Sequence, residues 1–205
     1  MTPDPAMQHQ HFEALYAASD DPWQVRERWY EQRKRALLLA CLGKPRYRSA
    51  FEPGCGNGEM TAALAPRCDQ LLACDGAASA VAAARRRLGD RPARTRIEQR
   101  SLPLDWPAGE RFDLIVMSEL GYYFDGAALD TILALAHAHL DEDGELVLCH
   151  WLHDFDDRLI STAALHARAA ALPGLVRTVH HQERDFLLEA WRMTPAADGA
   201  PGAPA

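Results

Sequence analysis

Three alternating glycines, Gly54, Gly56 and Gly58, are the residues of this sequence best suited to hold a ligand. Glycine takes backbone conformations closed to other residues and lets a ligand approach without meeting a Cβ atom. The residues that follow, 59–65, can form a helix whose first amide groups face the ligand. The same spacing also suits a tight turn between a strand and a helix. Taken alone, the glycines support a cofactor loop and a plain turn about equally.

An acidic residue follows the glycines at an informative distance. Asp75 comes 17 residues after Gly58, close to the roughly 20 residues that place a carboxylate on a ribose in nucleotide-binding α/β folds. Its two oxygens can accept hydrogen bonds from both ribose hydroxyls. Asp75 could instead cap the helix predicted to begin at Ser79. The spacing favours the ribose role, and with it the cofactor loop.

A second set of polar and aromatic side chains follows two later predicted strands, in residues 119–123 and 150–153. A histidine near its usual pKa, or a carboxylate, could take a proton from an amine, and aromatic rings could face a cationic group. The candidates for this chemistry are His150, His153, Glu119, Tyr122, Tyr123 and Trp151. Structural roles are the alternative, because a lone histidine at a strand end is more often structural than catalytic.

Alternating strands and helices must position these residues. Short apolar runs predict strands at 48–52, 70–75, 95–99, 112–118, 144–150, 175–180 and 186–193. Helices are predicted between them, at 59–65, 79–88, 127–139 and 160–171. This order indicates an α/β fold with an open, mostly parallel sheet, helices on both faces and a terminal antiparallel hairpin. Ligands bind such sheets across the carboxyl ends of the strands, where all the candidate residues fall.

The N-terminal part is predicted to be helical. Asp21 suits an N-cap and Pro22 the first helical position, so a helix to Cys41 is expected, with a shorter one before it at 11–17. Together these helices would form an extension or lid.

The length of 205 residues suits a single domain with a sizeable core. We expect the extension at 11–47 and the α/β core at 48–193, with 1–10 flexible and a disordered tail rich in proline, glycine and alanine at 194–205.

The composition limits the possible partners. The net charge of -7 argues against a broad electrostatic hold on nucleic acid, and the basic run Arg85–Arg87 is expected to form a solvated helix face. The five cysteines form no Cys-x-x-Cys pair, so they indicate neither a disulfide framework nor a metal site. This cysteine usage favours a reducing, cytoplasmic setting. Nothing in the sequence resembles a secretory signal or a membrane span. A small molecule is therefore the expected partner, and the oligomeric state stays open.

The glycine pattern differs from that of dinucleotide-binding loops, because its third glycine comes one residue early, which disfavours a dehydrogenase. Residues 52–58, Glu-Pro-Gly-Cys-Gly-Asn-Gly, resemble the first motif of class I S-adenosylmethionine-dependent methyltransferases. Residues 112–118 and 140–146 resemble that family's fourth-strand motif and its turn into the fifth strand. The resemblance implies a Rossmann-like fold with a seven-stranded sheet, and S-adenosylmethionine as the cofactor.

A narrower resemblance, carried by residues 21–23, 29–34, 64–69 and 118–123, is to the nodulation protein S family. Members of that family methylate the free amine of the terminal glucosamine in a deacetylated chitin oligosaccharide. Residues 149–154 are not typical of the nodulation enzymes, so the acceptor amine could differ. The alternatives are a methyltransferase for another small acceptor and a protein that binds the cofactor without catalysis.

The two resemblances together imply a set of cofactor contacts. In the wider family the glycine loop contacts the amino-acid part of the cofactor, the carboxylate after the second strand holds the ribose, and the third loop flanks the adenine. Many members have an acidic residue in the third loop, where this chain has Arg100-Ser101-Leu102. The implied contacts are Glu52, Gly54, Cys55, Gly56, Gly58, Asp75, Gly76, Ser101, Leu102, Ser118, Glu119 and Arg33. Arg33 would hold the cofactor carboxylate, or it could be one more charge on a solvated helix face.

Overall fold

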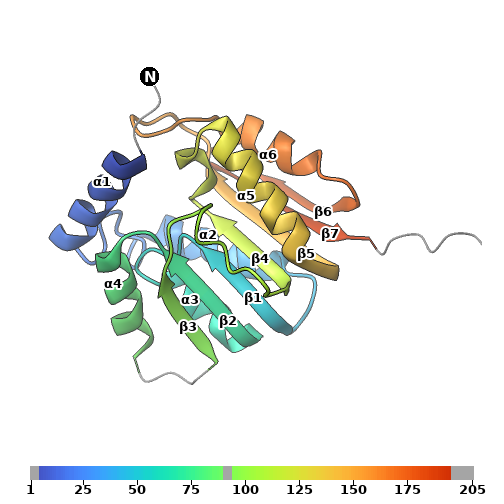
Figure 1. Cartoon of the computed structure of the whole chain (residues 1–205), viewed down its shortest axis with the longest axis horizontal. Coiled ribbons are helices and arrows are strands. Elements are labelled where there is room, and N and C mark those ends of the chain that lie inside the picture. Colours follow the sequence, from blue (N-terminus) through green and yellow to red (C-terminus); the bar gives the residue numbers. More distant parts are fainter. Residues whose placement is uncertain (1–4, 90–93, 195–205) are drawn as a thin grey trace, which may run out of the picture.

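Seven strands form one mixed sheet in the order β3-β2-β1-β4-β5-β7-β6 (Figure 1). The computed structural model describes residues 5–89 and 94–194. The strands are β1 (Tyr47–Pro53), β2 (Cys68–Asp75), β3 (Thr95–Gln99), β4 (Phe112–Ser118), β5 (Leu140–Trp151), β6 (Leu175–Gln182) and β7 (Phe186–Met193). The helices and 3-10 turns are α1 (Pro5–Ala18), α2 (Trp29–Cys41), α3 (Glu59–Leu64), η1 (Ala65–Arg67), α4 (Ala78–Leu88), η2 (Gly121–Tyr123), α5 (Gly126–His139) and α6 (Thr162–Ala170).

The strands β1 to β5 run parallel, and β7 pairs antiparallel with both β5 and β6. Residues 112–117 of β4 are all buried, as expected for a strand covered by helices on both faces. The strand order reverses between β1 and β4, and at such a switch point α/β sheets bind ligands. The predicted Rossmann-like sheet with a C-terminal antiparallel hairpin is confirmed.

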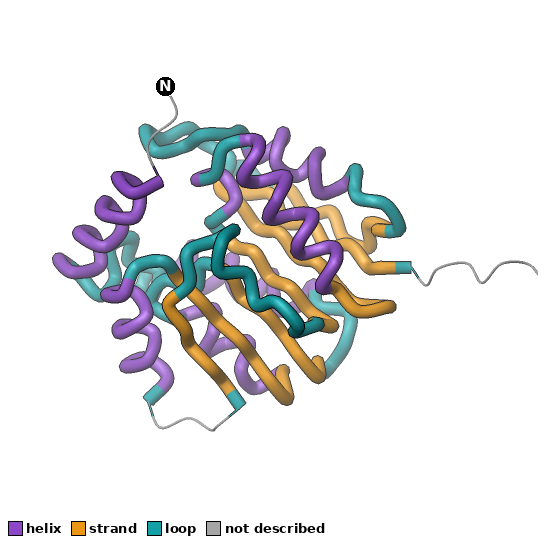
Figure 2. Tube along the Cα trace, viewed as in Figure 1, coloured by secondary structure: helices purple, strands orange, loops and turns teal. Residues whose placement is uncertain are grey.

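Two helical layers cover the sheet (Figure 2). On one face, Leu129 of α5 and Leu165 of α6 join a core cluster with Ile115 of β4. On the other, Leu38 of α2 packs in a cluster with Val116, the next residue of β4. Neighbouring residues of one strand thus face opposite layers, as the alternation of side chains along a strand requires.

α1 lies away from the sheet and packs beside α4 (Figure 1). It is longer than the helix predicted at 11–17, because it begins at Pro5. Residues 5–10, expected to be flexible, are therefore helical. Residues 1–4, and all but the first residue of the tail predicted at 194–205, lie outside the described residues.

The predicted continuous helix from Asp21 to Cys41 is wrong, because the chain turns before α2 begins. Gln24 has a φ of 56°, which a right-handed helix does not allow. The carboxylate of Asp21 does accept hydrogen bonds from Val25 N and Arg26 N, at 2.8 and 3.0 Å, as a helix cap would. The turn directs this segment toward the loop after β1.

Within residues 5–89 and 94–194, no helix combines the length and apolar character needed to cross a membrane. All five cysteines lie in this part of the chain, and none forms a disulfide. Burial raises the pKa values of Cys55, Cys68, Cys74 and Cys149. These four thiols are therefore protonated and unreactive near neutral pH.

Candidate functional site

The glycines form the loop between β1 and α3 in left-handed backbone conformations. Gly54, Gly56 and Gly58 have φ values of 72°, 52° and 82°, which residues with a side chain rarely adopt. A Cβ atom on Gly58 would lie 2.9 Å from the Cα of Ala84 in α4, and one on Gly56 would overlap the hydroxyl of Tyr16. Gly58 is therefore required for the close packing of the loop against α4, and Gly56 for the close approach of the Tyr16 hydroxyl to the loop.

The carboxylate of Asp75 lies against this loop at the end of β2. Its Oδ2 accepts a hydrogen bond from Gly56 N, and its Oδ1 accepts one from Ala77 N, each at 3.0 Å. Burial raises the pKa of Asp75, against the opposing effect of the backbone donors Ala77, Gly56 and Gly76. Each oxygen has a further lone pair with which to accept from a ligand. Asp75 thus both precedes and supports the start of α4, and faces the glycine loop.

α1 covers the glycine loop, and its residues were not identified from the sequence. Burial, and next the charge of Asp75, raise the pKa of Tyr16, whose hydroxyl lies over the loop. Glu13 accepts a hydrogen bond from Ser79 N at the start of α4, at 3.2 Å. Gln8 Nε2 donates to Tyr123 O in η2, at 2.7 Å. α1 therefore bridges the loops after β2 and β4.

Ion pairs fasten the segment between α1 and α2 to the same region. Arg86 of α4 lies 2.6 Å from Asp20. Glu59, the first residue of α3, pairs with Arg26 at 2.9 Å and with Arg87 at 2.5 Å. The basic run of α4 is exposed, as predicted, and two of its arginines also pair with residues that contact the N-terminal segment or belong to it.

The loop after β3, which holds the predicted adenine contacts, begins beside Asp75. Arg100 N donates to Asp75 O at 3.0 Å. Ser101 is exposed, and its N–H donates to Asp105 Oδ2 at 3.0 Å. Leu102 is partly buried against the core. The backbone of Arg100 thus joins this loop to Asp75, and the adenine contacts of Ser101 and Leu102 stay predictions.

Glu52 and Ser118 lie at the ends of the two strands that flank the switch point. Glu52 of β1 is 3% exposed, and burial raises its pKa to about 8. Its Oε2 has no hydrogen-bond donor among the described residues. Ser118 of β4 is partly buried and pairs in register with Cys149 of β5. Glu52 is therefore mostly protonated near neutral pH.

Glu119 follows β4 and is the centre of a charged cluster. Its φ of 55° is strained for a residue with a side chain. Lys34 Nζ lies 2.5 Å from Glu119 Oε1 and 2.9 Å from Glu31 Oε2. The Oε2 of Glu119 accepts from the Tyr122 hydroxyl and, at 3.0 Å, from Trp151 N. The structure thus brings three of the predicted catalytic candidates together and adds a buried lysine.

Lys34, and not Arg33, is the cation of α2 that reaches the site. Lys34 is 5% exposed. Burial acts to lower its pKa, but Glu119 and Glu31 raise it above its usual value. Arg33 instead donates two hydrogen bonds of 2.7 Å to Glu183, in the turn between β6 and β7. The guanidinium of Arg33 is thus held at the hairpin, and its contact with the cofactor carboxylate stays a prediction.

His150 is also placed differently from the prediction. It is fully buried in β5, and burial lowers its pKa well below the usual value. Gly121 N donates to its Nε2 at 3.1 Å, and its Nδ1 lies 3.1 Å from His166 Nε2. With both ring nitrogens occupied and no exposed surface, His150 cannot take a proton from an acceptor amine. The apolar run around it was the available signal, because both faces of such a strand are covered.

The remaining candidates line the loops after β4 and β5. His153 is at the surface, where its Nε2 lies 2.8 Å from Asp185 and its ring packs at 4.8 Å on Trp151. Tyr122 and Tyr123 pack edge to face at 4.8 Å. Phe12 of α1 also packs on Tyr123, at 4.8 Å. Tyr123 therefore lies between α1 and the sheet, with a packing role at least.

Arg158 closes the loop between β5 and α6 on itself. Its side chain is 6% exposed, and it donates hydrogen bonds of 2.8–3.1 Å to four acceptors within the loop and the first turn of α6. These acceptors are the carbonyls of Leu152, His153 and Ile160 and the hydroxyl of Thr162. The loop presents Phe155, which packs on Tyr122 at 5.0 Å.

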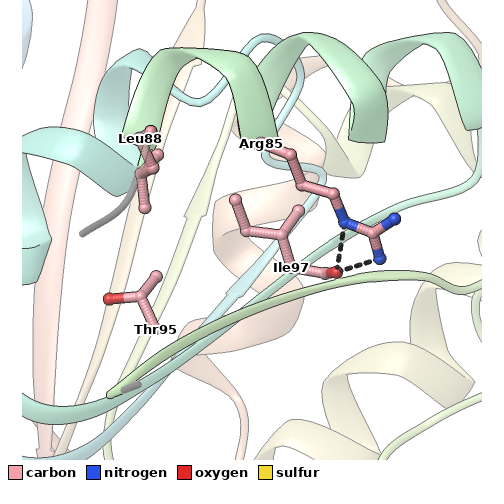
Figure 3. Close-up of a pocket in the computed structure, with 5 residues that line it drawn as sticks. Arg85, Leu88, Thr95 and Ile97 are labelled. Atoms are coloured by element: carbon pink, nitrogen blue, oxygen red, sulfur yellow. Dashed lines mark hydrogen bonds between the residues drawn. The ribbon is translucent and has the colours of Figure 1, made fainter. Parts of the chain in front are cut away.

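A separate hollow between α4 and β3 does not belong to this site. It is lined by residues that include Arg85, Leu88, Thr95 and Ile97 (Figure 3). Arg85 donates two hydrogen bonds to Ile97 O, at 2.6 and 3.2 Å. No group of three or more His, Cys, Asp or Glu side chains among the described residues could hold a metal ion.

Comparisons with known proteins relate the chain to one family. A family model described as Nodulation protein S (NodS) matches residues 5–150. Nodulation protein S of Rhizobium tropici is 34% identical over 112 residues, which are 54% of this chain and 46% of that protein. Nodulation protein S of Bradyrhizobium diazoefficiens is 34% identical over 108 residues, or 52% and 50%. The match thus spans about half the length of these curated relatives.

Solved structures show the same fold. A structure from Pseudomonas syringae, described as that of a candidate methyltransferase, is 49% identical with a TM-score of 0.71, covering 80% of this chain and 99% of that one. The N-methyltransferase NodS from Bradyrhizobium japonicum WM9, in complex with S-adenosyl-L-homocysteine, is 25% identical with a TM-score of 0.80. That alignment covers 90% of this chain and 97% of the other.

Proposed function

Because the chain belongs to the nodulation protein S family, we propose that it transfers a methyl group from S-adenosylmethionine to the nitrogen of a small amine. One observation carries the proposal: the glycine loop with Asp75 and the Glu119 cluster lie together at the switch point between β1 and β4. Leu120, next to Glu119, packs against the loop, since a Cβ atom on Gly54 would lie 2.8 Å from its side chain. Ligands at the two places would therefore be neighbours.

The residues at the loop fit the cofactor. Asp75 has lone pairs free for a ribose diol, the loop after β3 lies beside it for the adenine, and α1, through Tyr16, would act as the lid. When bound, S-adenosylmethionine supplies a sulfonium-bound methyl group that needs no activation by the protein. The contribution of this chain is to hold the two reactants in alignment.

Glu119 is the group that fits the acceptor amine. An amine accepts a methyl group only in its neutral form, so a proton acceptor within hydrogen-bond reach is needed. Unlike His150, Glu119 is partly exposed, and Lys34 and Tyr122 hold its carboxylate in place. We assign Glu119 the role of binding the amine and taking its proton.

We further propose an amino sugar as the acceptor and a cytoplasmic location for the enzyme. An amino sugar, such as the terminal unit of a deacetylated chitin oligosaccharide, is supported by the family. Five free cysteines support a reducing, cytoplasmic setting.

Titration with S-adenosylhomocysteine, together with transfer of a labelled methyl group, tests the proposal. Wild type should bind the ligand stoichiometrically, and Asp75→Asn should weaken binding about 10- to 100-fold, because bonds to a charged acceptor contribute roughly 1.5–3 kcal/mol. Asp69→Asn, at the other end of β2 and paired with Arg46, is the matched control and should bind as wild type does. The absence of heat with wild type would sink the proposal.

The acceptor panel should contain a deacetylated chitin oligosaccharide, glucosamine and simple alkylamines. Glu119→Gln should lower kcat by about 10²–10⁴-fold with little change in the dissociation constant of S-adenosylhomocysteine. Binding without transfer to any amine would favour a non-catalytic binder. Transfer to alkylamines alone would remove the amino sugar.

A further inference from the structure

A chain of buried polar side chains runs from η2 to the sheet edge through an otherwise apolar core. His150 is 0% exposed, and His166 of α6 and Glu189 of β7 are each 3% exposed. His150 Nδ1 lies 3.1 Å from His166 Nε2, and His166 Nδ1 lies 2.8 Å from Glu189 Oε2. At the edge, Arg177 and His180 of β6 each lie 2.7 Å from Glu189 Oε1. Most buried polar groups in proteins have a hydrogen-bond partner, and every ring nitrogen of His150 and His166 has one here.

The direction of the hydrogen bonds follows from the inner end of this chain. The backbone N–H of Gly121 can only donate, so the Nε2 of His150 must accept it and carry no proton. The Nδ1 of neutral His150 therefore carries the proton and donates it to His166. His166 in turn donates to Glu189, whose anionic form is held by Arg177. A single tautomer of each ring satisfies the whole chain.

The inner end lies directly behind the acceptor site. Gly121 is the first residue of η2, and the next residue is Tyr122, whose hydroxyl donates to Glu119. The ring of Tyr122 also packs edge to face on His150, at 5.3 Å. Gly121 has no space to shift toward the core, because a Cβ atom there would overlap Leu165.

We propose that His150 is a positioning residue for methyl transfer: its Nε2 holds the Gly121 amide and thereby keeps the Tyr122 hydroxyl on Glu119. This role rests on the proposed function, because Glu119 is the group assigned to the acceptor amine. His150 moves no proton and contacts no substrate. The chain through His166 and Glu189 serves to fix its tautomer, so that Nε2 is always an acceptor.

Two substitutions distinguish the roles of the two ring nitrogens of His150. The side-chain oxygen of Gln can take the place of Nε2, so His150→Gln keeps an acceptor for Gly121 N–H and loses the bond to His166. The side-chain nitrogen of Asn can take the place of Nδ1, so His150→Asn keeps the bond to His166 and loses the acceptor. Both variants should lower the melting temperature similarly, because each loses one of the two buried hydrogen bonds of His150.

The kinetic results should differ between these variants. His150→Asn should lower kcat at saturating S-adenosylmethionine about 10- to 100-fold, whereas His150→Gln should lower it less than about 3-fold. In a Tyr122→Phe background, His150→Asn should cause less than about 3-fold further loss, because both changes disrupt the same contact. The dissociation constant of S-adenosylhomocysteine should stay within about 3-fold of wild type throughout.

A second readout is independent of activity. Hydrogen exchange at the Gly121 amide should be at least 10-fold faster in His150→Asn than in wild type, and near wild type in His150→Gln. If wild type transfers no methyl group, the proposed function fails, and the exchange rates still decide whether His150 holds η2. Equal exchange and equal kcat in the Asn and Gln variants would overturn the proposal. The proposal would also be overturned if the loss of kcat in the double variant His150→Asn/Tyr122→Phe equalled the product of the losses in the two single variants.

Discussion

The two halves of the candidate site are built by different means. At the ends of β1 and β2, the backbone N–H groups of Gly56 and Ala77 donate to the carboxylate of Asp75, and both donors lie within residues 54–77. At the end of β4, side chains hold Glu119, and Lys34 comes from 85 positions away in the sequence. The first half is defined by backbone conformation, and the second by long-range packing.

This difference explains what could be predicted. Glycines at a fixed spacing before a carboxylate specify a local shape, so the cofactor half could be identified from a few neighbouring residues. The acceptor half depends on which face of α2 meets β4. Lys34 lies four residues before the fully buried Leu38 and shares its face of the helix. That spacing was a usable signal, and it would have favoured Lys34 over Arg33.

Removal of the buried cation should have the largest effect and tests whether the acceptor half depends on packing. Lys34→Met leaves Glu31 and Glu119 facing each other without a cation, and should lower the free energy of unfolding by about 3–5 kcal/mol. Arg33→Met, which breaks only a partly exposed pair with Glu183, should cost less than about 1 kcal/mol. Urea denaturation measures both.

The outcome for Arg33 also tests its predicted role. If Arg33→Met weakened S-adenosylhomocysteine binding more than about 10-fold, the result would support the predicted contact between Arg33 and the cofactor carboxylate. Equal destabilisation by the two variants would remove the distinction between the two cations.

The cofactor half is tested by a pair of glycines with the same φ. Gly58 and Gly109 both have φ 82°, but a Cβ atom on Gly109 would meet nothing within 4 Å. Gly109→Ala should cost about 1–2 kcal/mol of unfolding free energy for the left-handed conformation. Gly58→Ala should cost about 1–3 kcal/mol more, because its Cβ meets Ala84. Equal losses in urea denaturation would show that the close approach to α4 is unimportant.

The smallest effect concerns the two carboxyl groups at the switch point, because Glu119 has hydrogen-bond partners whereas Glu52 Oε2 has no donor among the described residues. The pKa of Glu52 is about 8 in the folded protein, above its usual 4.5. The stabilisation from the protonated form is complete below pH 4.5 and is lost as the pH rises through 8, by about 1.4 kcal/mol per pH unit.

Glu52→Gln should therefore gain about 2 kcal/mol in unfolding free energy relative to wild type between pH 5.5 and 7. The exposed Glu142→Gln is the control for loss of a carboxylate, and its difference from wild type should not change over this range. A constant difference for Glu52→Gln would show that Glu52 is already ionised at pH 5.5.

The strands were predicted within a few residues, because apolar runs bounded by turn residues report burial directly. The predictions fail where a contact with a residue distant in the sequence decides the structure of a segment, because the local sequence pattern does not show that contact. Asp21 and Pro22 match the pattern of a helix start, yet the chain turns at Gln24, Arg26 pairs with Glu59, and the helix begins only at Trp29. His150 was chosen for its chemistry, although its position inside a covered strand already implied a core side chain.

The loop that Arg158 closes has a consequence for protein engineering. All four of the acceptors described for Arg158 belong to residues 152–162, so the loop carries much of its own support. A segment of this kind can be exchanged as a cassette between relatives, with Arg158 retained as the anchor. Since Phe155 of this loop packs on Tyr122, libraries centred on this residue would diversify the acceptor side without altering a single glycine of the cofactor loop.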